Sequence, residues 1–299
     1  MSNEVRYAGL VGVVGRPNVG KSTLVNALVG EKVSIVTAKP QTTRHRIMGV
    51  STRGDRQFVF VDTPGIHSDT PRRMNRDMNR TAQDAARDAD VVLFLIQAGQ
   101  WNEEDQAILK GLKKLSVPVG LVINKVDRLD DRKELLPFME ELTQAADFHF
   151  VVPLSALKKE NLEPLMDELS VFLPESPAFF PADQHSDQSP QMVAAEVIRE
   201  KLMLRVHQEV PYALAVQIQS FKREGRLRRL EAIIWIERDG QKGIVIGKGG
   251  QVLKAIGTAA RKELESLWDC RVHLDLWVKV RAGWPDDPRL LGSMGIGGE

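Results

Sequence analysis

Short apolar runs alternate with helical patterns through the first 173 residues, and this alternation restricts the fold more than any other feature. The apolar runs are Leu10–Val14, Phe58–Val61, Val91–Ile96, Val117–Ile123 and Phe150–Leu154. They are followed in turn by helical spacing at Thr23–Val29, Arg73–Arg87, Glu103–Leu115, Asp131–Ala146 and Leu162–Phe172. Such alternation predicts a mainly parallel sheet with helices on both faces. One exception is expected, because Arg46–Arg53 and Gln57–Asp62 flank a tight Gly-Asp turn and predict an antiparallel hairpin.

The stretch from Pro174 to Pro190 contains four of the chain's 15 prolines and has no periodic apolar pattern, so it predicts an interdomain linker. The pattern after it is helix, strand, strand, helix, helix, strand, with expected elements at Met192–His207, Ala213–Phe221, Leu230–Arg238 and Lys254–Leu267 and a last strand at 272–280. We therefore expect a larger α/β domain at 1–173, a linker at 174–190, a smaller α+β domain at 191–281 and an irregular tail at 282–299.

Composition excludes several classes of protein. With 42% hydrophobic and 27% charged residues, the chain has the make-up of a globular protein rather than a disordered one. No apolar run is long enough to span a membrane, and the N-terminus lacks a secretory pattern. The single cysteine, Cys270, forms no internal disulfide and is interpreted as a small core residue, so we expect a reducing, cytoplasmic location.

The charge is unevenly divided between the two halves. Residues 1–190 carry 23 basic and 26 acidic side chains, and residues 191–299 carry 18 and 14, which gives net charges of −3 and +4. Clustered Lys and Arg attract a phosphate backbone, so the split favours a nucleic-acid partner for the second half, although a difference this small also arises by chance.

A phosphate-binding loop is predicted where the first strand ends, because glycine, four residues and Gly-Lys-Ser stand between a strand and a helix. Glycines let the backbone N–H groups turn inward toward an anion, and the following helix directs its positive dipole end at the same place. Lys21 is expected to reach the β- and γ-phosphates, and the Ser22 hydroxyl to bind Mg²⁺. The predicted nucleotide-binding residues here are Gly15, Arg16, Pro17, Asn18, Val19, Gly20, Lys21, Ser22 and Thr23.

Two later strand ends predict which base is read. Asn124, Lys125 and Asp127 follow one apolar strand, and Ser155, Ala156 and Leu157 follow the next. The Asp127 carboxylate can accept two hydrogen bonds from guanine N1–H and its amino group, a donor pair that adenine lacks. Asn124 would brace the neighbouring loops, Lys125 would cover the base, and the Ser-Ala-Leu turn would offer a backbone N–H. Together they favour GTP over ATP.

A magnesium and switch region is predicted between these motifs. Asp62, Thr63, Pro64 and Gly65 follow a strand; Asp62 would hold Mg²⁺ through water, and the Gly65 amide would meet the γ-phosphate. Upstream, Thr42 and Thr43 supply hydroxyls for the remaining Mg²⁺ position, with Thr43 favoured. The expected metal-binding residues are Ser22, Thr43 and Asp62, and Lys21, Thr43 and Gly65 are the expected catalytic ones.

In the second half, a glycine-rich turn lies between the two adjacent helices. Ile246, Gly247, Lys248, Gly249 and Gly250 expose backbone N–H groups beside a helix N-terminus, with Lys248 and Lys254 adding charge, and such a turn can clamp about four nucleotides of single strand. The basic run 222–229 touches phosphate or is a solvated hairpin tip; the sequence weighs both equally. Trp235, Trp268 and Trp277 are interpreted as packing residues, and Trp284 and Trp101 as candidates for exposure.

The sequence resembles the Era family of GTPases, in which a GTPase domain precedes an RNA-binding KH domain. The motifs that carry the resemblance are GRPNVGKS, QTTR, DTPG, NKVD and SAL. The resemblance covers essentially the whole chain. It implies binding of small-subunit ribosomal RNA near its 3′ end, a role in maturation of the small ribosomal subunit, loose association with the inner face of the membrane, and GTP, GDP and Mg²⁺ as ligands. We expect a monomer with no obligate protein partner.

The position after Gly65 departs from Ras-like enzymes, which place a water-orienting glutamine there. Here it is Ile66, whose hydrocarbon side chain neither donates nor accepts a proton. Related GTPases with a hydrophobic residue at this position use potassium, held partly by a phosphate-loop asparagine, and Asn18 stands there. This yields the hypothesis of slow, potassium-dependent hydrolysis.

Two other functions stay open on the sequence alone. The chain could be a GTP-dependent adaptor whose C-terminal domain mainly binds protein or membrane partners. It could also serve an RNA-modifying enzyme, but the second half contains no cofactor loop, metal cluster or nucleophile–base pair that such chemistry requires.

Overall fold

The computed structural model describes residues 4–66, 72–206 and 214–296, which form two compact units. The first unit consists of Met1–Ser34, Thr43–Pro71 and Asn75–Asp187, and the second of Ile35–Thr42, Arg72–Met74 and Gln188–Glu299. Two short pieces from the first half of the chain therefore pack with the second half.

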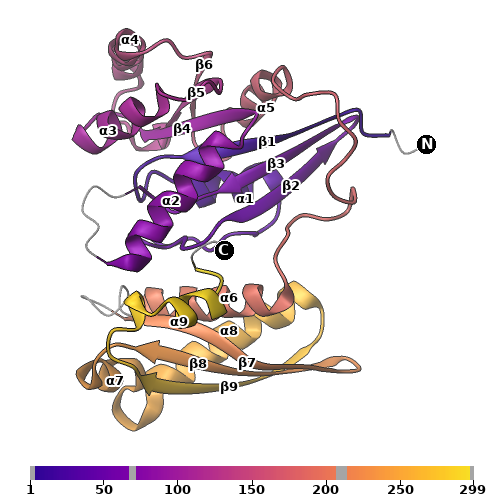
Figure 1. Cartoon of the computed structure of the whole chain (residues 1–299), viewed down its shortest axis with the longest axis vertical. Helices are drawn as coiled ribbons and strands as arrows, with labels where there is room; N and C mark the ends of the chain where they lie inside the picture. The colour runs from indigo at the N-terminus through magenta and orange to yellow at the C-terminus, as the bar shows by residue number, and fades with distance from the viewer. Residues whose placement is uncertain (1–3, 67–71, 207–213, 297–299) are drawn as a thin grey trace. The chain divides into compact units, whose positions relative to one another are not determined.

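The first unit is built on a six-stranded sheet (Figure 1). Its order is β2-β3-β1-β4-β5-β6, and every neighbouring pair is parallel except β2 and β3. The strands are β1 (Tyr7–Val14), β2 (Ile47–Arg53), β3 (Arg56–Asp62), β4 (Val91–Gln97), β5 (Val119–Asn124) and β6 (Phe150–Leu154). The predicted parallel sheet and the antiparallel hairpin are both confirmed.

Five helices of the first unit cover both faces of this sheet. The helices α1 (Lys21–Val29) and α5 (Leu162–Ser170) share one apolar core, and α2 (Arg73–Arg87), α3 (Glu103–Leu112) and α4 (Leu135–Ala145) contribute to the other. Short 3₁₀ turns η1 (Val126–Arg128) and η2 (Arg132–Glu134) follow β5. Since β1, β3, β5 and β6 run in the same direction, the loops after them meet at one edge of the sheet, where ligands of open α/β sheets bind.

The proline-rich stretch after α5 is bound to the sheet over much of its length. The buried Gln57 side chain accepts from the backbone N–H groups of Phe179 and Phe180 at 2.8 and 3.0 Å, and donates to the Phe180 carbonyl at 2.8 Å. Isolated bridges pair Tyr7 with Glu175 and Gly49 with Ser186. Up to Asp187 this stretch belongs to the first unit.

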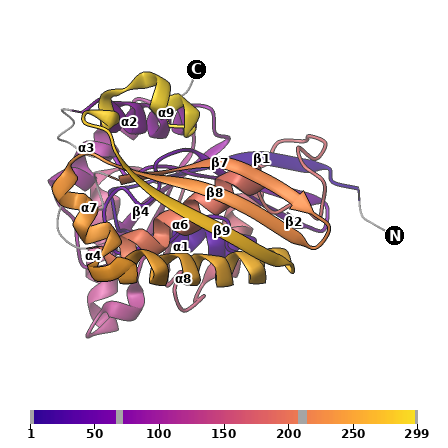
Figure 2. The ribbon, with the colours of Figure 1, turned by 90° about the horizontal axis from the view of Figure 1, so that it is seen from below.

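The second unit is built on a three-stranded sheet whose core face is covered by the helices at 190–268 (Figure 2). The strands β7 (Leu214–Glu224) and β8 (Leu227–Ile236) are antiparallel, and β9 (Arg271–Val280) runs parallel to β8. The helices are α6 (Pro190–Arg205), α7 (Asp239–Ile246) and α8 (Gln251–Trp268), with the short turn η4 (Lys248–Gly250) between the last two. The predicted α+β order is confirmed; the expected ends at His207 and Ala213 lie outside the described residues.

The segment after β9 is ordered rather than irregular as far as residue 296. It forms η5 (Trp284–Asp286) and α9 (Pro288–Ser293), and the Gln217 side chain of β7 donates to Ser293 Oγ at 3.1 Å. Trp284 has no exposed surface, so the expectation that it could be exposed is wrong. Gly297 and Gly298 lie outside the described residues.

Trp277 corrects another expectation, since it is 60% exposed instead of packed. Even-numbered residues of β9, such as Leu276 and Val278, join the core beneath α8, and Trp277 points to the opposite face. Trp268 does pack against the core and meets Phe221 edge to face, whereas Trp235 is half-buried on the same face of the sheet as Trp277 and donates to Gln217. Cys270 is half-buried against the core. Among the described residues, no helix is long and apolar enough to cross a membrane.

Candidate functional site

The loop between β1 and α1 has the geometry of a phosphate cradle. Gly20 adopts φ +105°, and a Cβ there would fall 2.3 Å from Asn124 Nδ2. At Gly15 a Cβ would lie 2.5 Å from the Leu95 carbonyl oxygen. Both positions therefore require glycine, one for its backbone angle and both for space. The first residues of α1 leave backbone N–H groups unpaired in the helix, which is the arrangement that binds anions.

Lys21 folds back over this loop. Its ammonium donates to the Gly15 and Arg16 carbonyls at 2.9 and 3.1 Å, and the residue is only 6% exposed. Burial lowers the pKa of Lys21 to about 8, while the Asp62 carboxylate acts in the opposite direction. A cation held in a buried loop without a full counter-charge is stabilised by an incoming phosphate.

The three residues predicted to bind metal lie together. Ser22 Oγ and Thr43 Oγ1 are 2.9 Å apart, and Thr43 Oγ1 donates to Asp62 Oδ2 at 3.3 Å. Asp62 has no exposed surface, and burial raises the pKa of its carboxyl. Its other oxygen, Oδ1, is buried without a hydrogen-bond partner among the described residues. Two hydroxyls beside a carboxylate with an unsatisfied oxygen form the hard oxygen set that suits Mg²⁺.

Thr42 and Thr63 lie elsewhere. The Thr42 hydroxyl donates to the Lys39 carbonyl at 2.6 Å and lies 2.7 Å from Thr37 Oγ1. Thr63, also buried, donates to the Val13 carbonyl at 2.7 Å and so ties the end of β3 to β1. Of the two threonines that the sequence offered for Mg²⁺, Thr43 is thus the one beside Ser22 and Asp62, and the role itself stays a prediction.

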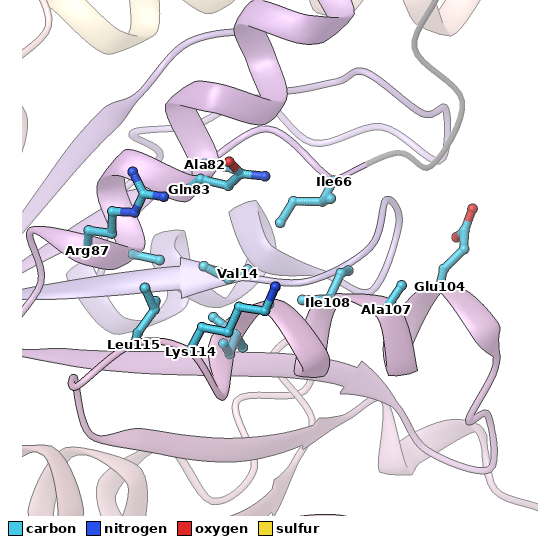
Figure 3. A pocket seen from close by; sticks show the side chains of 13 residues that line it. Val14, Ile66, Ala82, Gln83, Arg87, Glu104, Ala107, Ile108, Lys114 and Leu115 are labelled. Carbon is cyan, nitrogen blue, oxygen red and sulfur yellow. The ribbon is translucent and has the colours of Figure 1, made fainter.

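Gly65 lies against the phosphate loop, since a Cβ on it would fall 2.8 Å from the backbone nitrogen of Pro17. The next side chain, Ile66, lines a cavity of about 410 Å³ between α2 and α3 (Figure 3). Ala82 and Ile108 belong to the same lining, and its polar positions are Gln83, Arg87, Glu104 and Lys114. Ile66 is thus held by apolar packing and offers no group that could orient water.

Asn124 connects three loops of the predicted base site. It is 2% exposed; its Nδ2 donates to the Val19 carbonyl at 2.8 Å, and its Oδ1 accepts from the backbone N–H groups of Lys125 and Ala156 at 2.8 and 3.0 Å. The bracing role expected of this side chain is thus visible in its contacts. The Ala156 amide, one candidate donor to the base, is used by Asn124 in this structure.

Asp127 and Lys125 occupy the same corner. Asp127 Oδ1 accepts from Ser155 Oγ at 2.5 Å, and Leu157 is 68% exposed beside it. Lys125, at φ +66°, donates to the Asn18 carbonyl at 2.5 Å and to Gln97 Oε1 at 2.8 Å. Burial lowers the pKa of Lys125 to about 8, with help from Arg128 and Arg16. The sequence-based reasoning missed Gln97, whose position at the end of β4 was the available signal.

Arg16 points its guanidinium away from the loop. It donates to the buried Asp105 carboxylate at 3.2 Å and to Gln100 at 2.6 Å, so only its carbonyl, which accepts from Lys21, faces the cradle. Burial raises the pKa of Asp105, and the charge of Arg16 opposes this shift. Asp105 also completes a capping box with Asn102 at the start of α3. It is a second supporting residue that the motifs did not reveal.

In the second unit, the glycine-rich turn joins α7 to α8. Gly247, Gly249 and Gly250 all have positive φ, and a Cβ on Gly247 would fall 2.4 Å from Val252 Cγ2. Lys248 and Lys254 are exposed, and Ile246 is half-buried. The turn therefore presents backbone and cations beside the N-terminus of the 18-residue α8, as a KH loop requires.

The basic run 222–229 forms the β7–β8 hairpin tip, and several of its cations have partners within the chain. The Arg228 guanidinium lies 4.4 Å from the centroid of the Trp268 ring, and Arg229 pairs with Glu224 at 2.9 Å. Arg226 lies 3.9 Å from Asp269. These contacts favour the solvated hairpin tip over a dedicated phosphate site.

Fold and site together define a P-loop GTPase followed by a KH domain. Family models agree: residues 10–125 match the family described as 50S ribosome-binding GTPase, and residues 209–285 match the KH domain. The GTPase Era of Coxiella burnetii is 49% identical over 97% of this chain and 98% of its own length, and that of Pseudomonas aeruginosa is 48% identical over 97% and 95%. The chain belongs to the Era family of GTPases.

Two solved Era structures are similar over nearly their whole length. One is an Aquifex aeolicus Era variant bound to GDP·AlF₄⁻, with 39% identity, a TM-score of 0.94 and 97% of this chain and 99% of that chain covered. The other is Era in complex with MgGDPNP and nucleotides 1506–1542 of 16S ribosomal RNA, with 39% identity, a TM-score of 0.95 and coverage of 98% and 99%. The family resemblance and fold class read from the motifs are confirmed.

Proposed function

We propose that this chain is a GTP-driven switch whose KH domain binds small-subunit ribosomal RNA near its 3′ end, and that it assists maturation of the small ribosomal subunit. The observation that carries the proposal is the similarity, over 98% of this chain, to an Era structure that contains MgGDPNP and nucleotides 1506–1542 of 16S ribosomal RNA. The proposed functional division is a GTPase domain at 1–173, a linker at 174–190, a KH domain at 191–281 and a tail at 282–299.

The proposed reaction is attack of water on the γ-phosphate of GTP, promoted by positioning and charge stabilisation. Lys21 holds the β- and γ-phosphates, the Gly65 amide donates to the γ-phosphate, and Ser22, Thr43 and Asp62 hold Mg²⁺. The metal, when bound, neutralises charge on the phosphate oxygens. The backbone N–H groups of residues 15–23 other than Pro17, which has none, and the turn at 62–65 complete the phosphate contacts, and Asn124, Lys125, Asp127 and residues 155–157 hold guanine.

On the RNA side, the proposed contacts are the backbone of 246–250 and the ammonium groups of Lys248 and Lys254. The three glycines with positive φ let a sugar–phosphate backbone approach closely. The two exposed cations add attraction that depends on salt but not on base sequence.

Potassium is a further part of the proposal. Because Ile66 cannot orient water, a monovalent cation bound partly by Asn18 would supply the missing positive charge near the phosphates. Asn18 has φ +63°, and its carbonyl already accepts from Lys125, which fixes the backbone of the loop at this point. Hydrolysis should be faster in potassium than in sodium at equal ionic strength, and Asn18→Ala should remove the difference. Equal rates in the two salts would contradict this part.

We also propose that the protein works as a monomer in the cytoplasm, associated loosely with the inner face of the membrane. These expectations rest on the family resemblance. Sedimentation of the purified chain and gentle fractionation of cells test them, and a stable dimer or an absence from unwashed membranes would count against them.

The central test is crosslinking of bound RNA in cells, followed by sequencing. The native chain is compared with the Lys248→Asp, Gly249→Asp double variant, which adds negative charge in the glycine-rich turn. A Cβ at Gly249 meets no atom within 4 Å, but its φ of +59° strains any side chain there, and aspartate tolerates this angle better than most residues, so folding of the variant is checked by circular dichroism. One discrete segment at the 3′ end of the small-subunit RNA, lost in the double variant, is the expected result.

A matched control is Lys262→Asp, an exposed lysine on the same helix α8 but far along it from the turn. It should retain the RNA segment if the turn, rather than general positive charge, carries the binding. Recovery of the same RNA from native and double-variant chains, or of none, would favour the adaptor whose C-terminal domain binds protein.

A further inference from the structure

The segment 35–42, which leads into Thr43, packs with the second unit and not with the sheet from which it emerges. The polar contacts that hold it come from α6, the first helix of that unit. Any inference from this packing to GTP rests on the proposed function, because the position of Thr43 affects activity only if Thr43 serves GTP and Mg²⁺. It nevertheless concerns Glu196 and Arg199, which no motif identified.

Arg199 of α6 makes the central contact. Its Nη2 donates to the Thr42 carbonyl, and its Nη1 donates to the Gln41 carbonyl at 3.4 Å. The same guanidinium is held from behind by the carboxylate of Glu196, with Nε donating to Oε1 at 2.8 Å and Nη2 to Oε2. Arg199 is 3% exposed and Glu196 6%, so the pair is sequestered from water.

Because the Arg199 guanidinium is buried, each of its N–H groups needs a hydrogen-bond partner within the protein. A buried ion pair is costly to desolvate, and it is retained only where further hydrogen bonds satisfy the remaining donors. Glu196 orients the planar guanidinium, and the outward N–H groups of the guanidinium then meet two consecutive backbone carbonyls. Backbone at 41–42 is thereby fixed one residue before Thr43, whose hydroxyl lies beside Ser22 and Asp62.

Two other contacts between α6 and the segment act in the same way. Lys39 donates to the Met203 and Val206 carbonyls at the C-terminal end of α6, where a cation also complements the helix dipole. Glu200 accepts from the Val36 N–H at 3.1 Å. Segment 35–42 is therefore attached near its beginning, at Lys39 and at its end.

The helix α6 is in turn connected by an ion pair to α8, the helix that follows the glycine-rich turn. Lys201 pairs with Glu200 at 2.7 Å and with Glu263 of α8. Burial lowers the pKa of Lys201, but hydrogen bonds with these two carboxylates outweigh it and raise the pKa overall. The ammonium thus stays charged and joins α6 to α8.

We propose that Arg199 is a positioning residue for the GTPase reaction: held by Glu196, it fixes the Gln41–Thr42 backbone and so places the Thr43 hydroxyl for Mg²⁺ in the GTP state. GDP, which lacks the γ-phosphate, depends less on Thr43. Loss of Arg199 therefore weakens GTP binding more than GDP binding.

The experiment measures affinities of a non-hydrolysable GTP analogue and of GDP, each as a function of Mg²⁺ concentration, for the full chain and its variants. Arg199→Gln should reduce analogue affinity at least about tenfold, the factor for one charge-assisted hydrogen bond, and raise the Mg²⁺ concentration needed. GDP affinity should change less than about twofold. Arg199→Lys should restore only part of the loss, since an ammonium lacks the planar fork.

Controls separate positioning from folding. Arg205→Gln removes an exposed arginine of the same helix and should leave both affinities unchanged. If Arg199→Gln does not fold because Glu196 loses its buried cationic partner, Lys39→Met leaves that pair intact and should shift the affinity ratio in the same direction. An unchanged analogue-to-GDP ratio in a folded Arg199 variant, or in Lys39→Met, would overturn the proposal.

The proposed function and the positioning role are tested by different measurements, RNA crosslinking for the first and the ratio of analogue to GDP affinity for the second. RNA crosslinking can be lost or misdirected while the affinity ratio still depends on Arg199, which would reject ribosomal binding and keep the positioning role. An intact RNA segment with an unchanged ratio would do the reverse.

Discussion

Replacing Asn124 with alanine should damage the base site more than any single loss of a base contact, because this side chain joins three loops. The substitution removes a donor to the Val19 carbonyl and an acceptor for the N–H groups of Lys125 and Ala156. Asn124 is 2% exposed, so water cannot easily replace these partners. Each buried group left unpaired costs about 1–3 kcal/mol, and partial relaxation makes a total of about 2–5 kcal/mol reasonable.

The chain offers a matched control in Asn26, which makes three hydrogen bonds of the same kind elsewhere. Its Nδ2 donates to the Ser34 carbonyl at 2.7 Å, and its Oδ1 accepts from the N–H groups of Val33 and Ser34, both at 2.9 Å. Asn26→Ala should therefore destabilise the GTPase domain without disturbing the loops that we propose hold guanine.

Calorimetric titration with GDP, alongside thermal unfolding, distinguishes the two variants. Both should lower the melting temperature, but only Asn124→Ala should weaken GDP binding, by about 30-fold or more if roughly 2 kcal/mol of the loss falls on the bound state. If Asn124→Ala lowered stability yet bound GDP as Asn26→Ala does, the bracing argument would be refuted.

Other substitutions test the remaining roles. Lys21→Ala removes a buried cation from the phosphate cradle and should weaken GTP binding by at least about 100-fold in the same titration. Asp127→Asn replaces a carboxylate acceptor by an amide that carries a donor, so nucleotide competition should show a shift of about 100-fold or more from guanine toward xanthine. Gly65→Ala places a Cβ 2.8 Å from the Pro17 backbone, and the resulting strain of about 1–3 kcal/mol should reduce kcat/KM for GTP about 10- to 100-fold in a phosphate-release assay. Normal values in any of these variants would contradict the role assigned to that residue.

The strand–helix alternation predicted the fold well because each apolar run must be buried on both faces of a parallel sheet. The glycines and the lysine of the predicted phosphate loop could also be identified from the sequence, because an anion site requires that backbone angle at glycine and that spacing to lysine. Residues that hold the site residues in place from distant parts of the sequence could not be predicted. Asp105 contacts Arg16 from the start of α3, and nothing in its sequence surroundings distinguishes it from an ordinary surface carboxylate. Gln97 contacts Lys125, and its position at the end of an apolar strand was the one signal it offered.

Trp277 illustrates a signal that was present but misread. Val272, Leu274, Leu276, Val278 and Val280 alternate strictly, so a residue at 277 must point to the opposite face of the strand. The interpretation took 277 as a core-like strand position, whereas the period of two already placed the ring on the face away from the helices. Trp284 failed for the opposite reason: glycines around it suggested an irregular tail, yet a short helix carries Leu290 and Leu291 into burial beside it.

The charged residues of α6 show most clearly what the sequence could not predict. Glu196 and Arg199 stand three residues apart on a helix, a spacing that ordinarily indicates an exposed ion pair of little energetic weight. Their burial follows from the segment 35–42, more than 150 residues earlier in the chain and without any periodic pattern that would predict where it packs. Because sequestering two charges is expensive unless every donor is satisfied, the backbone carbonyls of Gln41 and Thr42 are part of what makes the pair tolerable. The dependence is mutual: the buried pair needs these two carbonyls to satisfy the outer donors of Arg199, and the backbone that leads into Thr43 is held in turn by the pair.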